Sequence, residues 1–126
     1  MRMESPIGRV RGLGSAKSGT HHWWIQRVTA IAMAPLVIWF LASVVALIGA
    51  DHDAIVAWIR QPVVAALLVL LVTTGLYHMR LGVQVVVEDY IHKPATKLFL
   101  LLFATFAAIV AGAIAIISIL TVLFGG

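Results

Sequence analysis

The chain has 126 residues, of which 62% are hydrophobic and only 11% charged, with a formal net charge of +4 and a mean hydropathy of +1.05. Soluble domains carry about 25% charged residues, and a globule of this size buries only about two-thirds of its surface, so the composition excludes an ordinary soluble domain. Because the chain has no cysteine, disulfide scaffolds, thiolate-bound metal clusters and cysteine nucleophiles are excluded as well.

Residues 1–24 form the first predicted segment, an arm that is rich in Gly, Ser and Arg. Its first part has no apolar core, so it is not a secretory signal peptide. The Arg and Ser content loosely resembles an organelle transit peptide, but Glu4 and the lack of an apolar face weaken that interpretation. We therefore expect a bacterial inner membrane rather than a mitochondrial one as the location.

Three apolar segments follow the arm, at residues 25–49, 62–87 and 98–124, and long gaps between charged residues define them. A membrane-spanning helix needs about 20 mostly apolar residues, and only structures that pair their own backbone groups can cross hydrocarbon. The sequence thus predicts an all-α membrane protein in which residues 25–126 form an anchor domain with three transmembrane helices. Pro35 lies inside the first of them, where membrane helices tolerate a kink.

The basic residues predict the orientation in the membrane. The arm and the start of the first span hold five of them, the second loop holds Lys93 and Lys97, and the first loop holds only Arg60. The positive-inside rule therefore places the N-terminus and the second loop in the cytoplasm. Since the calculated pI of about 10.1 comes from these flanks, it indicates membrane topology and lipid headgroups rather than a nucleic-acid partner.

Most polar residues at membrane depth lie in the second span. An ionisable group inside a span is costly and indicates a functional site by default. At 100° per residue, one stripe of this helix contains His78, Gly82, Val85 and Asp89. A neutral imidazole can ligate haem iron, and Gly75 and Gly82 leave room beside it, so the stripe predicts a haem-sized slot. The alternative is a histidine hydrogen-bonded to a neighbouring helix, with glycines for close packing.

Asp89 and Tyr90 are predicted to lie where the second helix leaves the membrane on the cytoplasmic side. A phenol at this position can donate a hydrogen bond to a quinone carbonyl, and a carboxylate can orient that donor or relay protons. The alternative is an ordinary helix-end carboxylate beside an interfacial tyrosine.

Two arginines have several candidate roles. Arg80 lies about 160° from His78 around the helix. Its candidate roles are to pair with a cofactor propionate, a lipid phosphate or a partner carboxylate, or to extend toward the lipid headgroups. Arg27, at the start of the first span, either binds an acidic cofactor group or a partner, or marks the cytoplasmic boundary.

Two further polar clusters are predicted to have no site of their own. His21 and His22 diverge by 100° on a helix and have no evident third metal ligand, so we expect them to be interface residues. Between the first two spans, His52 with Asp51 and Asp53 is predicted to form a solvated loop.

The run HMRLGVQVVVEDY, from His78 to Tyr90, resembles the H-x3-G-x-Q-x4-D-Y signature of the smaller hydrophobic membrane anchor of succinate dehydrogenase, the SdhD family of respiratory complex II. The run QRVTA, from Gln26 to Ala30, resembles the R-x-T-A opening of that family's first helix. The chain length and the three predicted spans match the family too. The resemblance is therefore specific in two short patches and general over the rest of the chain.

The resemblance implies a division of roles. The chain would form half of a heterodimeric helix bundle with a second, SdhC-like anchor, and its other partners would be a flavoprotein and an iron–sulfur subunit. His78 would be one axial ligand of a haem b iron shared with the second anchor, and Arg27 would lie near the haem. Tyr90 would bind ubiquinone with support from Asp89. Succinate would be oxidised on the flavoprotein, so no catalytic residue for that step is expected here.

Two other classes of protein remain alternatives. One is the larger, cytochrome b-type anchor of a related quinol-linked enzyme, although its expected S-x-x-x-R-x-T-G type opening is absent and only one intramembrane histidine is present. The other is a small non-redox membrane protein with an assembly or structural role, in which His78 and Arg80 simply join helices.

Overall fold

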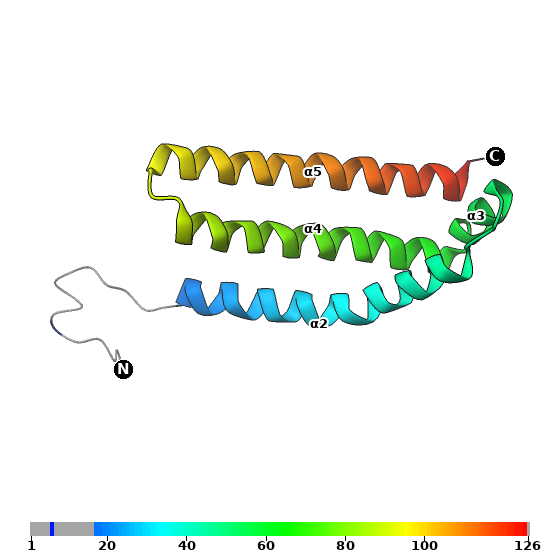
Figure 1. The fold of residues 1–126 in the computed structure, drawn as a ribbon, viewed down its shortest axis with the longest axis horizontal. Helices are drawn as coiled ribbons and strands as arrows, with labels where there is room; N and C mark the ends of the chain where they lie inside the picture. The colour runs from blue at the N-terminus through cyan, green and yellow to red at the C-terminus, as the bar shows by residue number, and fades with distance from the viewer. Residues whose placement is uncertain (1–5, 7–16, 126) are drawn as a thin grey trace.

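The computed structural model describes Pro6 and residues 17–125. The elements of this part of the chain are all helices: α2 (Lys17–Ala46), α3 (His52–Ile59), α4 (Pro62–Tyr90) and α5 (Pro94–Phe124) (Figure 1). Three of them are long and apolar enough to cross a membrane, over Thr20–Ala46, Pro62–Tyr90 and Pro94–Phe124. The predicted all-α class with three spanning helices is confirmed.

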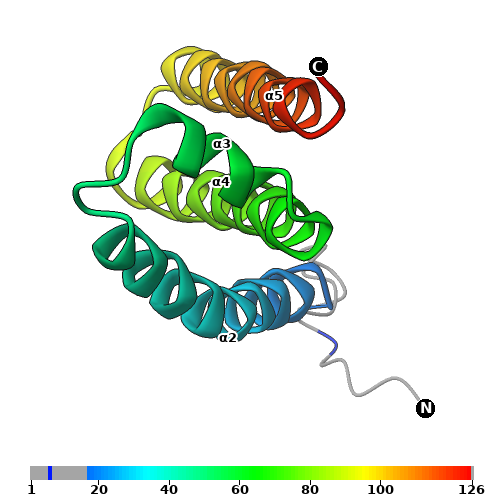
Figure 2. The same cartoon turned by 90° about the vertical axis from the view of Figure 1, so that its right-hand side faces the viewer.

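The three long helices form a single open layer, with α4 between α2 and α5 (Figures 1 and 2). Both outer helices pack along α4, whereas α2 and α5 do not contact each other within the described residues. The buried apolar residues of the described chain accordingly all belong to α4: Val64, Ala65, Leu68, Leu81 and Val87. The central helix carries the packing, and large apolar surfaces of α2 and α5 stay exposed to lipid or to a partner.

Prolines begin two of the long helices, α4 and α5, and one proline lies inside α2. Pro62 and Pro94 begin α4 and α5, where a fixed φ is already helical and the missing N–H would have no partner anyway. Pro35 lies inside α2, which bends over its second half (Figure 1). A proline in a helix interior removes one backbone hydrogen bond and favours such a bend.

The first helix differs from the predicted arm and span. Residues 1–24 were expected outside the membrane helix, but α2 already begins at Lys17; most of the remaining arm lies outside the described residues. A helix that leaves hydrocarbon continues into the headgroup region when no proline stops it, and none occurs between Lys17 and Pro35.

The prediction of a solvated loop at Asp51, His52 and Asp53 is wrong in its secondary structure, because α3 begins there. Asp51 is the N-cap of this helix, and its Oδ1 accepts a hydrogen bond of 2.9 Å from the Ala54 N–H. The side chains of His52 and Asp53 are still exposed. At the other end of α3, Trp58 stacks on Trp39 of α2, with ring centroids 5.9 Å apart, so α3 folds back over the layer.

The three long helices run the length of the layer in alternating directions, so the polar segments that flank them gather at its two ends. The start of α2, the end of α4 and the start of α5 lie at one end of the molecule, and α3 lies near the end of α5 at the other (Figure 1). After α2 the chain turns at Gly49, whose φ of +84° is strained for residues with a Cβ. The start of α2 at Lys17 and the Lys93–Lys97 region thus share one end, which is consistent with the predicted orientation.

Arg60 connects the first loop to the end of α5. Its Nε donates a hydrogen bond to the Val122 carbonyl at 3.0 Å, and its NH2 donates to the Gly125 carbonyl at 2.5 Å. The last carbonyls of a helix lack helical partners and carry partial negative charge, so a guanidinium stabilises them.

We expect Arg60→Ala to lower the stability of the purified protein in detergent by about 1 kcal/mol, because the α5 carbonyls lose a charged donor. Thermal unfolding followed by tryptophan fluorescence measures the change. Arg60→Lys keeps the charge but loses the paired donors, and should fall between the alanine variant and the wild type. An unaltered melting temperature in the alanine variant would show that these contacts add nothing to the fold.

Candidate functional site

His78 lies on the side of α4 that faces α2, and its ring is tied to that helix by one nitrogen. Its Nδ1 is 3.0 Å from the Oγ1 of Thr29 on α2. The Nε2 atom has no hydrogen bond to any residue in the described part of the chain. The two interpretations of His78, a helix-joining residue and a ligand, are therefore compatible: one nitrogen joins the helices while the other keeps its bonding capacity.

The two glycines near His78 differ in their surroundings. A Cβ added to Gly82 would meet no atom within 4 Å, so the backbone borders open space one turn from His78. A Cβ added to Gly75 would lie 3.8 Å from the Cε of Met33, so this side is filled by α2. The predicted haem-sized slot beside His78 is therefore open at Gly82, whereas α2 occupies the space at Gly75.

This arrangement fits a haem better than a metal ion held by protein ligands alone. Within the described residues, no three His, Cys, Asp or Glu side chains gather into a metal site. Haem iron needs only an axial ligand from the protein, and a neutral imidazole with a fixed ring and a free nitrogen is a suitable donor. The half-buried His78 beside open space at Gly82 meets that requirement.

A polar stripe on α2 accompanies the Thr29–His78 contact. His22, Gln26 and Thr29 are spaced by four and three residues and so share one face of the helix. His22 Nε2 and Gln26 Oε1 are buried, and neither has a hydrogen-bond partner among the described residues. Buried polar atoms without partners are costly, so these two atoms are candidates for a hydrogen bond with a group beyond the described residues. Sequence reasoning missed this stripe, although the four- and three-residue spacing of its polar residues is the signal that could have found it.

Arg27 lies on a different face of α2. Two residues apart on a helix diverge by about 160°, so Arg27 points away from the face on which Thr29 contacts His78. Its side chain is exposed, and its Cζ lies 5.3 Å from the centre of the Trp23 ring, within the range of a cation–π contact. The structure does not bring Arg27 and His78 together, and its role near a haem stays a prediction.

Asp89 and Tyr90 lie in the last turn of α4, at the end where α2 begins (Figure 1). Tyr90 is 75% exposed, and Asp89 is exposed as well. Neither side chain has a hydrogen bond within the described residues. Eleven residues at 1.5 Å each separate Asp89 from His78, roughly 16 Å along the helix axis. Both polar groups are therefore free for a ligand or a partner subunit at the membrane surface.

Arg80 joins α4 to α5 on the face away from His78. Its Nε donates to Thr105 Oγ1 at 3.1 Å and its NH1 donates to Gln84 Oε1. The Gln84 amide in turn donates to Glu88 Oε1 at 3.0 Å. This chain of contacts runs along α4 at four-residue steps and links the arginine charge to a carboxylate nearer the helix end. The candidate roles of Arg80 thus include a structural one inside the chain.

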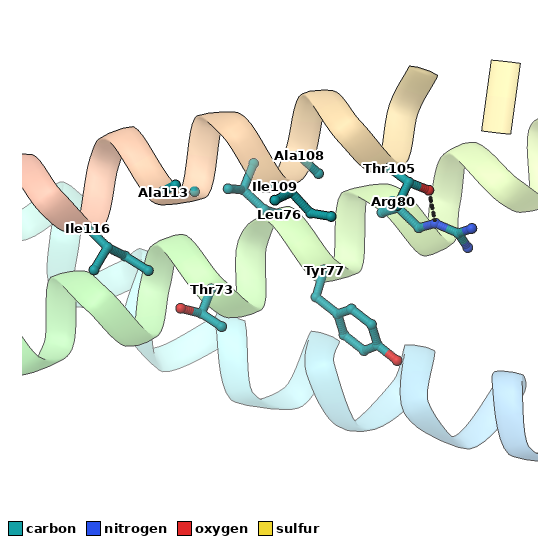
Figure 3. A pocket seen from close by; sticks show the side chains of 10 residues that line it. Thr73, Leu76, Tyr77, Arg80, Thr105, Ala108, Ile109, Ala113 and Ile116 are labelled. Carbon is teal, nitrogen blue, oxygen red and sulfur yellow. Dashed lines mark hydrogen bonds between the residues drawn. The ribbon is translucent and has the colours of Figure 1, made fainter. Parts of the chain in front are cut away.

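Arg80 and Thr105 also lie at one end of an open groove between α4 and α5 (Figure 3). The groove has a volume of about 500 Å³, and most of its lining is apolar. Gly112 lets the two helices approach here, because a Cβ at this position would lie only 3.2 Å from Leu76 Cδ1. The groove is on the Arg80 face of α4 and is separate from the His78 site.

The open layer of three candidate spanning helices, with its large exposed apolar surface, defines a membrane protein whose remaining surfaces lipid or other subunits can cover. Comparison with known sequences agrees. The chain belongs to the family of succinate dehydrogenase/fumarate reductase transmembrane subunits, whose sequence profile matches residues 1–123.

Several curated relatives identify the branch of this family. The chain is 42% identical over 85 residues to the succinate dehydrogenase hydrophobic membrane anchor subunit of Rickettsia bellii, covering 68% of each chain. It is 37% identical over 101 residues to the same subunit of Rickettsia conorii, covering 78% of this chain and 80% of the relative. The subunit of Paracoccus denitrificans is 30% identical over 115 residues, covering 90% and 89%. No solved structure shows significant similarity to the chain.

These relatives confirm the predicted family. The chain is a multi-pass membrane protein of the complex II anchor type, and the names of the relatives favour the hydrophobic membrane anchor over the larger cytochrome b-type anchor and over a non-redox assembly protein.

Proposed function

We propose that this chain anchors succinate:quinone oxidoreductase, complex II, to the bacterial inner membrane, supplies one axial ligand to haem b and forms part of the ubiquinone reduction site. The observation that carries the proposal is the state of His78: Nδ1 is engaged by Thr29 at 3.0 Å, while Nε2 has no described partner and open space lies beside Gly82. The partners are a flavoprotein, an iron–sulfur subunit and a second, SdhC-like anchor.

The haem site is shared in this proposal because the described spans offer one suitable ligand. His78 is the histidine within α4, and the other histidines lie near helix ends or in α3. A second axial ligand then has to come from another polypeptide, and the open layer leaves room for its helices beside α4. When bound, haem b supplies a one-electron redox centre inside the membrane. The task of this chain is to hold the ring of His78 and to keep the Gly82 side open.

The ubiquinone site is placed at the end of α4. Reduction of a quinone consumes two electrons and two protons, so it needs hydrogen-bonding groups near water beside an apolar cavity. Tyr90 donates its phenolic proton to a quinone carbonyl, and Asp89, the next residue, orients that donor or passes protons from solvent. Their exposure at the helix end supports this role.

The orientation follows from the basic residues. The start of α2 and the α4–α5 loop lie at one end of the layer and carry four of the six described Lys and Arg residues, which favours a cytoplasmic location for this end. Asp89 and Tyr90 share that end, so the quinone site faces the side on which the extramembrane subunits bind. Succinate is oxidised on those subunits, and this chain contributes no residue to that step.

Purification from native membranes through a tag on this chain tests the proposal. We expect a flavoprotein, an iron–sulfur protein and a second small hydrophobic protein to copurify, with succinate–quinone reductase activity and the reduced-minus-oxidised spectrum of a b-type haem. A tagged chain that enters the membrane but is recovered without haem and without these proteins would contradict the proposal.

A further inference from the structure

Resting on the proposed haem site, we infer that Thr29 is a positioning residue for the iron ligand: its hydroxyl accepts the Nδ1 proton of His78, so that the unprotonated Nε2 faces the iron. The observation is the contact of 3.0 Å between Thr29 Oγ1 and His78 Nδ1, which joins α2 to α4 at membrane depth. The role goes beyond the ligand itself, because it assigns a residue on another helix to the choice of tautomer.

The direction of this hydrogen bond follows from counting protons. A threonine hydroxyl has one proton to donate and two lone pairs that accept. Thr29 Oγ1 lies 2.8 Å from the Ile25 carbonyl oxygen and 3.0 Å from that of Gln26. Carbonyl oxygens only accept, and the contact with the Ile25 carbonyl is the shortest that the hydroxyl makes, so we assign the hydroxyl proton to it. Toward His78 the hydroxyl oxygen is therefore the acceptor, and Nδ1 is the donor.

The tautomer of the imidazole is then fixed. A neutral imidazole has one N–H, so a proton on Nδ1 leaves a lone pair on Nε2. That lone pair is what a haem iron requires from its axial ligand. The arrangement matches a general pattern in which a metal-bound histidine donates its other N–H to a fixed acceptor, which orients the ring and raises the basicity of the ligand.

The acceptor is held rigidly in place. Threonine is branched at Cβ, so few rotamers are available to it in a helix, and the bonds to the Ile25 and Gln26 carbonyls favour the observed one. One turn further along α2, Met33 Cε would lie 3.8 Å from a Cβ at Gly75 of α4. This close packing keeps the two helices at the distance that the Thr29–His78 hydrogen bond requires.

The test uses the complete purified complex with Thr29→Val and Thr29→Ser. Valine keeps the shape of threonine but removes the acceptor, whereas serine keeps the hydroxyl. We expect the valine variant to retain haem about 10- to 100-fold less tightly during dilution in detergent. Its haem midpoint potential should rise, because a less basic ligand stabilises ferric iron less, and the electron paramagnetic resonance spectrum of the ferric haem should change. The serine variant should restore all three properties.

Thr73→Val is the matched control. Thr73 lies in α4, the helix that carries His78, and within the described residues its hydroxyl bonds only to the Val69 carbonyl of its own helix, at 2.8 Å. We expect its haem retention and potential to equal those of the wild type. Thr29→Ala provides a second variant without the hydroxyl and is measured in the same way if valine prevents assembly.

The outcomes separate this inference from the function on which it rests. If His78→Ala loses haem while the hydroxyl-free variants of Thr29 keep the wild-type retention, potential and spectrum, the positioning role is wrong and the haem ligand stands. If His78→Ala keeps its haem, the proposed function fails, and the role of Thr29 fails with it.

Discussion

Replacing His78 with alanine is expected to remove haem b from the assembled complex, with at least a tenfold lower haem content per complex. The reason is the loss of the axial bond that His78 is proposed to make to the iron, because α4 contains no second histidine. Alanine also leaves Thr29 Oγ1 without its partner on α4. The reduced-minus-oxidised absorbance of the purified complex measures the effect.

Two comparisons separate the loss of a ligand from the loss of the fold. His52→Ala removes an exposed histidine from α3 at the opposite end of the layer, and its haem content should equal that of the wild type. His78→Gly with added imidazole should recover part of the spectrum, because the free ligand enters the space left by the side chain. A complex that contains His78→Ala and a full complement of unaltered haem would contradict the assignment.

Tyr90→Phe is expected to slow ubiquinone reduction by about 100-fold, because a positioned proton donor contributes factors of that order to proton-coupled steps. The substitution removes only the phenolic oxygen, and Tyr90 has no hydrogen bond within the described chain that the change would break. Succinate oxidation with a soluble electron acceptor should keep its wild-type rate, because that step occurs on other subunits. The ratio of the two activities is the measurement.

The other tyrosine of the chain provides a matched control. Tyr77 lies in the same helix but lines the groove between α4 and α5 (Figure 3). We expect Tyr77→Phe to leave both activities unchanged. A fall of both activities to the same extent in Tyr90→Phe would indicate a damaged complex rather than a quinone site, and would count against the proposal.

The spanning helices were predictable from the sequence because apolar length and charge gaps decide them, and no packing partner is needed for that inference. The short helix α3 was missed, although Asp51 followed by a run of apolar residues is a recognisable helix start. The polar character of Asp51, His52 and Asp53 favoured a loop, because the residues preferred at a helix N-cap are also those preferred in loops. The predicted span from residue 25 does not give the start of α2, which begins at Lys17, because a helix can continue beyond the hydrocarbon.

The candidate site was predictable only along one helix. Periodicity within α4 placed His78 and Gly82 on one stripe and put Arg80 on another, and these relations need no knowledge of other helices. The Thr29–His78 hydrogen bond depends on how far α2 slides along α4, which a single sequence does not specify. The contact between Arg80 and Thr105 has the same origin, since it requires the register of α5 against α4.

The single layer of helices has a consequence for the life of the protein in the cell. In the described part of the chain the buried apolar residues all lie on the middle helix, so most of the helical surface is open to the surroundings as long as no other subunit covers it. Such an orphan subunit is a natural substrate for membrane quality-control proteases. We therefore expect its abundance to follow the supply of the proposed second anchor rather than its own rate of synthesis, so that stoichiometry is set by assembly.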